Sequence, residues 1–516
     1  IAGYLTYELG ALLNGTGSDG VGAPLLALGM YDAPREHRPR EGGATPARIS
    51  ALLPTMSYQA YACAVASILH SIYDGDVYQV NLTVPHAFSL DGDAQALWES
   101  VARTTHAPYQ AFVSDGAGDI LSWSPELFLD FEDGRITTKP MKGTALPSAP
   151  HELLSAKNLA EHVMIVDLLR NDLGRIASDV SVATLGTVET YPTFLTMTST
   201  ITGKLPEDWT FERVVRNVFP CGSITGAPKR SAIEHIANLE NARRDVYCGS
   251  IGYLSPHRQG WWNVAIRTAR VQGSTGIFHA GGGIVSDSEP TEEWKEIQTK
   301  TSFLRTFSSS IELWETFSSV CLSETLWAHL ARLSASALEF GIAYDCKALK
   351  DAALELCARE RCVRRLRLRL HADGSFTTSS ETLDMPLASQ SVCLSSERVS
   401  ADDPFLRHKT SWRPAHDRAW NVALKNNCFD AILCNASGHI TEGSRTNIFV
   451  EIDGAMWTPS LECGLLPGIL RSRLVSEGRA RERILTRADL ESADAIYAGN
   501  SARGLLRVRL VSIDDD

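Results

Sequence analysis

The alternation of strand-like and helix-like segments restarts once along this chain, near residues 305–312. A full series of helices and strands precedes this point, and a new strand pattern, SSSIELWETFSSV (308–320), follows it. The chain has 516 residues, whereas one domain usually has about 100–200 residues. We therefore predict two domains, residues 1–305 and 311–516, with a boundary near residue 310 and no internal repeat.

Hydrophobic periodicity predicts the helices and strands of the first domain. Residues 155–177 (SAKNLAEHVMIVDLLRNDLGRIA) form the clearest helix, in which Gly174 lies near the end. Its apolar side is predicted to contain Leu159, Val163, Ile165 and Leu168. Further helices are predicted at 226–242 and 290–307, and strands at 77–90, 262–272 and 276–285. The run DILSWSPELFLDFEDGRITTKPMKGT (119–144) is predicted to form strands joined by a DG turn.

Composition and charge exclude several classes of function. No apolar run approaches the roughly 20 residues that a membrane-spanning helix needs. The net charge of −12 argues against nucleic acid as a partner. The eleven cysteines include no C-x-x-C pair, which favours a reducing compartment, and we expect a cytoplasmic protein. The chain begins at Ile1, so we expect that it starts inside a longer reading frame.

Three glutamates in the first domain are candidates for a magnesium site. Glu161 lies near the start of the long helix, and Glu293 and Glu296 are three residues apart on another predicted helix, where both can face the same way. Magnesium prefers oxygen ligands and retains water or substrate oxygens in its shell. Taken singly, each glutamate is better explained as a solvated helix carboxylate, so spacing alone leaves both interpretations open.

Two further stretches can bind a carboxylate. HAGGGIV (279–285) offers consecutive backbone N–H groups that no side chain covers. Arg267 is predicted to lie on a strand, where its planar guanidinium can bind a carboxylate through two hydrogen bonds. A tight strand crossing and an exposed strand charge are the plainer explanations. Lys142, in PMKGT (140–144), is on this evidence a surface charge, a phosphate contact or a nucleophile.

Taken in order, the motifs of the first domain are much more specific. They are SPELFL, PMKGT, AEHVMIVDLLRNDLGRIA, FPCGSITGAPKRSA, YCGSIGYLS, NVAIRTA and AGGGIVSDSEPTEEWKEIQTK. This series resembles the chorismate-utilising enzyme family, which includes anthranilate, isochorismate and aminodeoxychorismate synthases. The resemblance covers residues 1–305 and implies an α/β (α+β) fold, in which two large sheets form a sandwich ringed by helices.

The resemblance also implies roles for individual residues. Glu161 and Glu296 match the family's magnesium (Mg²⁺) ligands, with Glu293 close by, and the ion would hold the C1 carboxylate of chorismate. Glu126 matches a general acid that helps the C4 hydroxyl to leave. The groups that match substrate-binding positions are Arg267, Gly281, Gly282, Gly283 and Lys229.

Lys142 is the position that separates the family's members. Anthranilate synthases resemble AGT where this chain has KGT, whereas aminodeoxychorismate synthases resemble KGT. In the latter, the lysine attacks ring C2, and ammonia then enters at C4 and expels the lysine. Burial would lower the pKa of Lys142 toward neutrality, as this attack requires. Thr196 replaces a histidine that several relatives carry, which weakens an anthranilate synthase assignment.

The second domain carries another lysine within a set of polar loops. Lys409 lies in LRHKTSWR, Glu442 in ITEGSRTNIFV, and Arg332 on a predicted helix at 326–341. LLPGILR (465–471) predicts a turn that enters a helix, which is a natural phosphate site. Pyridoxal phosphate (PLP) needs a lysine, a carboxylate beside its pyridine nitrogen and a phosphate cup. Each of these residues also has an ordinary structural explanation.

Together these motifs resemble the fold-type IV PLP enzymes, over residues 311–516. That family includes branched-chain and D-amino acid aminotransferases and aminodeoxychorismate lyase, and its fold has two α/β subdomains. The resemblance implies that Lys409 binds PLP as a Schiff base and that Glu442 faces the pyridine nitrogen. The residues that match phosphate-binding positions are Arg332, Gly468, Ile469 and Ser501.

The two resemblances together imply a bifunctional enzyme. The first domain would aminate chorismate to 4-amino-4-deoxychorismate, and the second would eliminate pyruvate to give 4-aminobenzoate, a folate precursor. The chain has no Gly-x-Cys-x-Gly motif followed by His-x-Glu, so ammonia would come from a separate glutamine amidotransferase subunit. We expect a homodimer through the PLP domain. The alternatives are an anthranilate synthase, a second domain that is an aminotransferase, and a second domain that is a non-catalytic scaffold.

Overall fold

The computed structural model describes residues 1–16, 24–32, 34–36, 47–145, 156–190, 195–320, 323–360, 362–383 and 390–512. The chain forms two compact units. Unit 1 contains Ile1–Arg48, Pro54–Gln272 and Gly276–Ser308, and unit 2 contains Ile49–Leu53, Gly273–Thr275 and Ser309–Asp516. The proposed domain bounds, 1–305 and 311–516, stay a prediction about separately folding domains.

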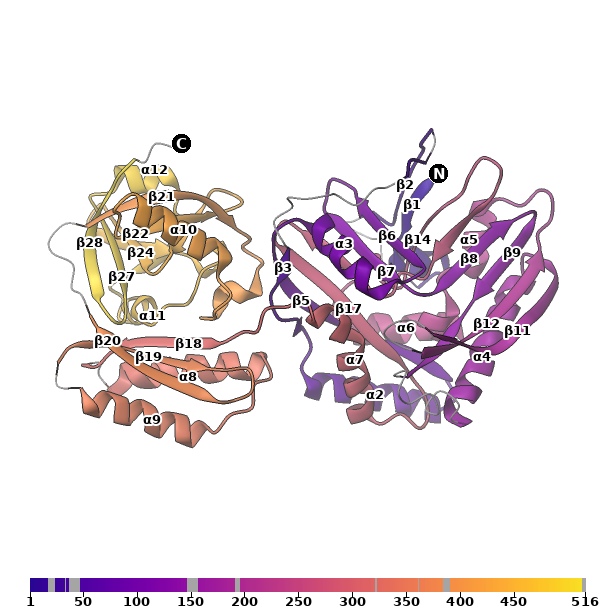
Figure 1. The fold of residues 1–516 in the computed structure, drawn as a ribbon, viewed down its shortest axis with the longest axis horizontal. Coiled ribbons are helices and arrows are strands. Elements are labelled where there is room, and N and C mark those ends of the chain that lie inside the picture. The colour runs from indigo at the N-terminus through magenta and orange to yellow at the C-terminus, as the bar shows by residue number, and fades with distance from the viewer. Residues whose placement is uncertain are drawn as a thin grey trace. The chain divides into compact units, whose positions relative to one another are not determined.

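Unit 1 is built on two large sheets with helices around them (Figure 1). Among the described residues, one sheet has nine strands in the order β10-β12-β9-β8-β15-β14-β1-β2, with β11 beside β12. Its strands are β1 Ala2–Leu5, β2 Leu26–Gly29, β8 Leu127–Glu132, β9 Arg135–Lys139, β10 Met141–Ala145, β11 Ser178–Thr190, β12 Leu195–Lys204, β14 Ser250–Tyr253 and β15 Gly260–Asn263. The predicted DG turn joins β8 to β9, because Asp133 and Gly134 both have positive φ angles, 47° and 74°.

The second sheet of unit 1 has eight described strands in the order β13-β5-β17-β16-β7-β6, with β3 and β4 beside β5. They are β3 Arg48–Ile49, β4 Leu53–Pro54, β5 Gln79–Asp91, β6 Tyr109–Ser114, β7 Asp119–Ser124, β13 Gly226–Ala227, β16 Thr268–Gln272 and β17 Thr275–Ile284. The predicted α/β class with two large sheets is confirmed.

The described helices of unit 1 begin at residues that suit a helix N-terminus. The side chains of Ser57, Asp93 and Thr210 accept hydrogen bonds from the first turns of α2, α3 and α5. The helices are α1 Tyr7–Leu13, α2 Tyr58–Tyr73, α3 Ala94–Thr105, α4 Ala156–Gly174, α5 Phe211–Val218, α6 Lys229–Leu239 and α7 Pro290–Arg305, with a 3₁₀ turn at Gly222–Ile224. The helices predicted at 155–177, 226–242 and 290–307 are confirmed as α4, α6 and α7.

Two predictions about unit 1 are wrong in detail. The apolar side of α4 was predicted to contain Leu159, Val163, Ile165 and Leu168. Ile165 is buried as predicted and Leu168 is half-buried, but Leu159 and Val163 are 42% and 53% exposed, and the buried side also includes Val166 and Leu169. This buried side also contains polar residues, so hydrophobicity alone does not identify it.

The strand predicted at 262–272 is in fact two strands in two different sheets. Trp262 and Asn263 end β15, and Thr268 begins β16. Arg267 lies in the connection with a φ of 50°, and not on a strand as predicted. A short connection between sheets leaves no signal in the apolar pattern, because residues on both sides of it are buried.

The part of unit 2 that the structure describes forms two subdomains, as predicted, and the following counts refer to that part. The first is a three-stranded sheet, β18-β19-β20, with two helices: β18 Leu313–Ser318, β19 Arg364–Leu370, β20 Phe376–Thr382, α8 Ser323–Glu339 and α9 Cys346–Arg359. The second is an eight-stranded sheet in the order β23-β22-β21-β28-β27-β24-β25-β26. Its strands are β21 Gln390–Val399, β22 Asp430–Asn435, β23 Ile440–Gly443, β24 Asn447–Ile452, β25 Ala455–Pro459, β26 Arg481–Arg483, β27 Ala495–Asn500 and β28 Gly504–Leu510. Its helices are α10 Pro414–Lys425, α11 Ile469–Ser476 and α12 Arg487–Ser492, with 3₁₀ turns at Pro404–Arg407 and Leu461–Cys463.

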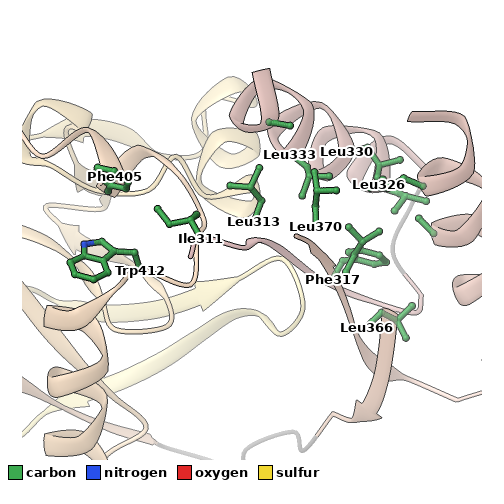
Figure 2. Close-up of a cluster of buried hydrophobic side chains, with 14 of the residues drawn as sticks. Ile311, Leu313, Phe317, Leu326, Leu330, Leu333, Leu366, Leu370, Phe405 and Trp412 are labelled. Carbon is green, nitrogen blue, oxygen red and sulfur yellow. The ribbon is translucent and has the colours of Figure 1, made fainter. Parts of the chain in front are cut away.

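The core of the first subdomain follows from a period-2 pattern in β19, whose sequence is RRLRLRL. Leu366, Leu368 and Leu370 are fully buried and pack with Phe317 of β18 and with leucines of α8 such as Leu330. Figure 2 shows this cluster around the β18 and α8 side chains. Because successive side chains of a strand point to opposite faces, the arginines that alternate with these leucines lie on the other face of the sheet. No described helix is long and apolar enough to cross a membrane.

Candidate active sites

The first site surrounds Lys142 on β10, where burial lowers the pKa of its ammonium group. The carboxylate of Glu161 on α4 acts against this shift, and the ammonium of Lys300 on α7 adds to it. Glu126 and Glu296 also favour the charged lysine. Lys142 is half-buried and so keeps partial solvent exposure. The structure therefore brings together Lys142 and three of the predicted glutamates, and it adds Lys300.

Glu126 lies between β7 and β8 and is 4% exposed. Burial raises its pKa to about 7, although a hydrogen bond of 2.9 Å from Ser223 Oγ acts in the opposite direction. Lys142 and the backbone N–H of Met141 also lower it. A carboxyl group with this pKa is protonated in a large fraction of molecules at neutral pH, so it can donate a proton.

The carboxylates of α7 lie against the glycine segment of β17. A Cβ atom added to Gly282 would lie 3.1 Å from Glu293 Oε2 and 3.9 Å from Glu296 Oε1. Lys300 Nζ lies 2.7 Å from Glu296 Oε1 and donates to the Gly281 carbonyl at 2.7 Å. Lys300 was not predicted, although its position one helical turn after Glu296 was a readable signal.

The donor set suits magnesium better than a softer ion. Glu161 and Glu296 come from two helices and supply carboxylate oxygens beside Lys142. The buried hydroxyl of Tyr61, whose pKa is raised by burial and then by Glu293 and Glu296, has no hydrogen-bond partner among the described residues. The described residues contain no group of three or more His, Cys, Asp or Glu that could hold an ion alone. Carboxylate oxygens such as those of these glutamates are the kind of ligand that magnesium prefers.

The remaining predicted residues of the first site differ in their surroundings. The Arg267 guanidinium lies over the Phe303 ring of α7, 5.8 Å from its centroid. Lys229 makes an ion pair of 2.7 Å with Asp172 of α4 and donates to the Val218 carbonyl at 2.9 Å. These contacts tie Lys229 to the end of α4, and its role in substrate binding stays a prediction.

One buried group near the glycines was missed. A Cβ atom on Gly283 would lie 2.5 Å from Nε2 of Gln79, which is fully buried on β5. Neither polar atom of this carboxamide has a partner among the described residues. The stretch YQVNLT, which contains Gln79, was the available signal.

The second site surrounds Lys409, which lies between the 3₁₀ turn at 404–407 and α10. Burial lowers its pKa to about 7, Glu315 opposes this shift, and Arg332 adds to it. Trp314 of β18 fixes the backbone here by donating its N–H to the Lys409 carbonyl at 2.8 Å. A lysine with this pKa is partly neutral at pH 7, as a nucleophile or a proton carrier must be.

Glu442 on β23 is a buried carboxylate held by two cationic or potentially cationic groups. Its Oε1 accepts hydrogen bonds from Arg413 Nη2 at 3.0 Å and His416 Nε2 at 2.9 Å. Burial acts to raise the pKa of Glu442, but Arg413 and then His416 hold it below its usual range. Arg413 and His416 were not predicted: Arg413 ends the quoted motif LRHKTSWR but was given no role, and His416 lies three residues beyond it.

Arg332 is part of a network that the sequence did not indicate. Its Nε and Nη2 donate to the two oxygens of Glu315 at 2.9 and 2.7 Å, and its Nη1 donates to the Pro467 carbonyl at 3.0 Å. His329 bonds to Glu315 through Nδ1 and to Ser501 Oγ through Nε2, the latter at 2.7 Å. Glu315 therefore joins the helix residue Arg332 to the loop residue Ser501.

The predicted phosphate cup lies at the start of α11. Gly468 precedes the helix, and a Cβ atom there would lie 1.7 Å from Asn447 Oδ1, so the position requires glycine. Ile469 and Ser501 line one cavity of about 340 Å³, whose described lining does not include Gly468, Lys409 or Glu442. With Lys409 and the carboxylate of Glu442, this donor set fits PLP: an amine, an anion for the pyridine nitrogen, and N–H and hydroxyl donors for a phosphate.

Comparison with known proteins gives two family matches. A family model described as chorismate binding enzyme matches residues 1–306, and one described as Amino-transferase class IV, a family that implies PLP, matches residues 323–511. Aminodeoxychorismate synthase component 1 of Salmonella typhimurium is 36% identical over 338 residues, 58% of this chain and 74% of that protein. Anthranilate synthase component 1 of Methanothermobacter marburgensis is 35% identical over 260 residues, 48% of this chain and 56% of that protein. The crystal structure of anthranilate synthase component I from Streptococcus pneumoniae is similar with a TM-score of 0.51 and 26% identity, over 59% of this chain and 80% of that chain.

Proposed function

Since the chain belongs to the chorismate binding enzyme family, we propose that unit 1 aminates chorismate to 4-amino-4-deoxychorismate and that unit 2 converts this product to 4-aminobenzoate and pyruvate. The observation that carries the first step is the half-buried Lys142, with its lowered pKa, beside the protonatable Glu126. The similarity to an aminodeoxychorismate synthase supports this choice, and so does the class IV aminotransferase match for the second step. Ammonia would come from a separate glutamine amidotransferase. A homodimer and a cytoplasmic location stay predictions.

In unit 1, neutral Lys142 would attack ring C2 while Glu126 donates its proton to the departing C4 hydroxyl, which leaves as water. Ammonia would then add at C4 and expel Lys142. Arg267 and the N–H groups of Gly281–Gly283 would hold substrate carboxylate. Magnesium, when bound by Glu161 and Glu296, would neutralise a ring carboxylate and withdraw electrons.

In unit 2, PLP, when bound, would supply an electron sink for the bond cleavage. Arg332, Ser501 and the N-terminus of α11 would hold its phosphate, and Glu442 would keep its pyridine nitrogen protonated. Lys409, whose pKa is about 7, would accept the C4 proton of the substrate. Product analysis with and without PLP tests this division: 4-amino-4-deoxychorismate should accumulate without PLP, and 4-aminobenzoate should form with it.

The amination should slow as the pH rises above about 7, because burial raises the pKa of Glu126 to about 7 and only its protonated form can donate. At fixed free ammonia, kcat/KM for chorismate should fall about tenfold per pH unit on this alkaline limb, and Glu126→Gln should lower it roughly 10²–10⁴-fold. Glu132→Gln, on the exposed end of β8, is the matched control. If kcat/KM of Glu126→Gln still fell above pH 7, the decrease would be due to the titration of another group.

Removal of magnesium should stop the amination and leave unit 2 intact. With EDTA, chorismate consumption should fall at least about 100-fold and return when magnesium is added. Glu161→Gln and Glu296→Gln should each raise the magnesium concentration needed for half-maximal rate at least about tenfold. Glu292→Gln, an exposed carboxylate on α7 paired with Lys295, should change neither quantity. Full activity in EDTA would rule out the metal role.

A further inference from the structure

The face of β19 opposite the leucine core carries a row of arginines. Arg365, Arg367 and Arg369 alternate with buried leucines and are themselves half-buried. Arg367 lies opposite Thr316 of β18, and Arg369 lies opposite Trp314. Three guanidinium groups therefore lie along one strand, on the side of the sheet away from the core.

Two of these arginines lack a carboxylate of their own. Arg365 makes an ion pair with Glu381 on β20. Within the described part of the chain, Arg367 and Arg369 make no ion pair, and both guanidinium groups lie over the Trp314 ring, 5.7 and 5.5 Å from its centroid. A flat guanidinium above an indole ring is held in place while its N–H edge remains available to an anion.

This row belongs to the surroundings of the reactive lysine. The backbone N–H of Trp314 donates to the Lys409 carbonyl at 2.8 Å, so the residue whose indole lies under the two arginines pairs with Lys409 through the backbone. Arg367 is among the groups that lower the pKa of Lys409.

Further arginines approach from the second subdomain. Burial lowers the pKa of Arg367, and Arg365, Arg369 and Arg445 act in the same direction, whereas Glu381 opposes them. Arg445 has its own carboxylate partner in Asp417, at 3.4 Å, just as Arg413 has Glu442. The unneutralised positive charge therefore belongs to Arg367 and Arg369.

Unpaired positive charges that are half-buried beside one another have an unfavourable electrostatic free energy. An anion that binds between them offsets this unfavourable term. The planar fork of arginine matches a carboxylate. We propose that Arg367 and Arg369, held over Trp314, bind a carboxylate of the unit 2 substrate, which selects a substrate with a second carboxylate. This proposal rests on the proposed function for the identity of that substrate, since 4-amino-4-deoxychorismate carries two carboxylates.

A cofactor phosphate is the other anion with the same chemistry. The predicted phosphate contacts, at the start of α11 and at Ser501, are separate from β19, which favours the substrate carboxylate. The test must therefore measure PLP affinity and substrate-type binding separately in the same variants.

The probes are benzene-1,3-dicarboxylate and benzoate, and the readout is the visible absorbance of bound PLP, which reports unit 2 alone. The chain of residues 1–516 loaded with PLP should bind the dicarboxylate more tightly than benzoate. Arg367→Gln should weaken dicarboxylate binding about 10–100-fold, the usual value of a charge-assisted hydrogen bond, and leave PLP affinity unchanged. Arg367→Lys keeps the positive charge but loses the planar guanidinium. Its affinity for the dicarboxylate should lie between those of the wild type and Arg367→Gln. Arg364→Gln is the control, because Arg364 lies on the same strand and bonds to Ser380 and Glu360.

The same variants should raise KM for 4-amino-4-deoxychorismate about 10–100-fold and change kcat little. An unchanged dicarboxylate preference in Arg367→Gln would overturn the proposal, and so would a loss of PLP affinity equal to the loss of dicarboxylate binding. If 4-aminobenzoate does not form but the preference for the dicarboxylate over benzoate depends on Arg367, the carboxylate site is supported and the lyase function is wrong. If 4-aminobenzoate forms but this preference does not depend on Arg367, the lyase function is supported and the carboxylate site is wrong.

Discussion

Replacement of Lys142 by alanine should lower the rate of chorismate amination by at least about 10³-fold, because the variant lacks the nucleophile that opens the reaction. Burial lowers the pKa of Lys142, which favours the neutral amine that a nucleophile needs, although Glu161, Glu126 and Glu296 oppose this shift. Lys142→Arg should be equally inactive, since arginine keeps the charge but does not lose its proton. The measurement is single-turnover conversion of chorismate with ammonia and magnesium.

Two controls separate a chemical loss from a loss of fold. Lys139→Ala removes a lysine three residues earlier, on β9, where it pairs with Glu189, and should keep amination near the wild-type rate. The visible absorbance of PLP in unit 2 should be the same in all these variants. Amination by Lys142→Ala at the wild-type rate, with no added amine, would contradict the covalent role.

Replacement of Lys409 by alanine should abolish 4-aminobenzoate formation, with a decrease of at least about 10³-fold, and should remove the visible absorbance of covalently bound PLP. The reason is that burial lowers the pKa of Lys409 to about 7, which makes this amine both the attachment point and the proton carrier. Chorismate consumption should continue, so 4-amino-4-deoxychorismate should accumulate. Chromatography of the reaction mixture and an absorbance spectrum measure the two effects together.

Lys425→Ala is the matched control, because Lys425 ends α10 and is exposed. It should keep both the absorbance and the product. Persistence of the absorbance in Lys409→Ala would show that another lysine holds the cofactor, and unchanged product formation would show that unit 2 works without Lys409.

The helices and the hairpin that position the first site were predictable where a sequence motif lies within a segment of clear hydrophobic periodicity or contains a turn signal. The helix α4 with Glu161, the helix α7 with Glu293 and Glu296, and the DG hairpin before Lys142 all follow from local sequence. The convergence of Glu126 and Lys142 followed from the resemblance, since no spacing rule brings together a loop between two strands and a strand of another hairpin.

The residues that were missed contact the site through long-range packing. Glu315 and His329 bond to Arg332 and Ser501 across three elements, and Arg413 reaches Glu442 from 29 residues away. Arg267 was misplaced because its strand pattern hides a crossing between sheets. The alternation in RRLRLRL is typical of a two-faced strand, but no strand was predicted there, and which face lies toward Lys409 depends on the packing of β19 against β18.

The most direct test of this account is the identity of the aromatic product. Purified protein with chorismate, ammonium, magnesium and PLP should yield 4-aminobenzoate and one equivalent of pyruvate, identified by chromatography and mass spectrometry against both aminobenzoate standards. By the proposed mechanism, the para product should require Lys142 in unit 1 and Lys409 in unit 2. Formation of 2-aminobenzoate instead, independent of PLP and of Lys409, would contradict the proposed function of both units.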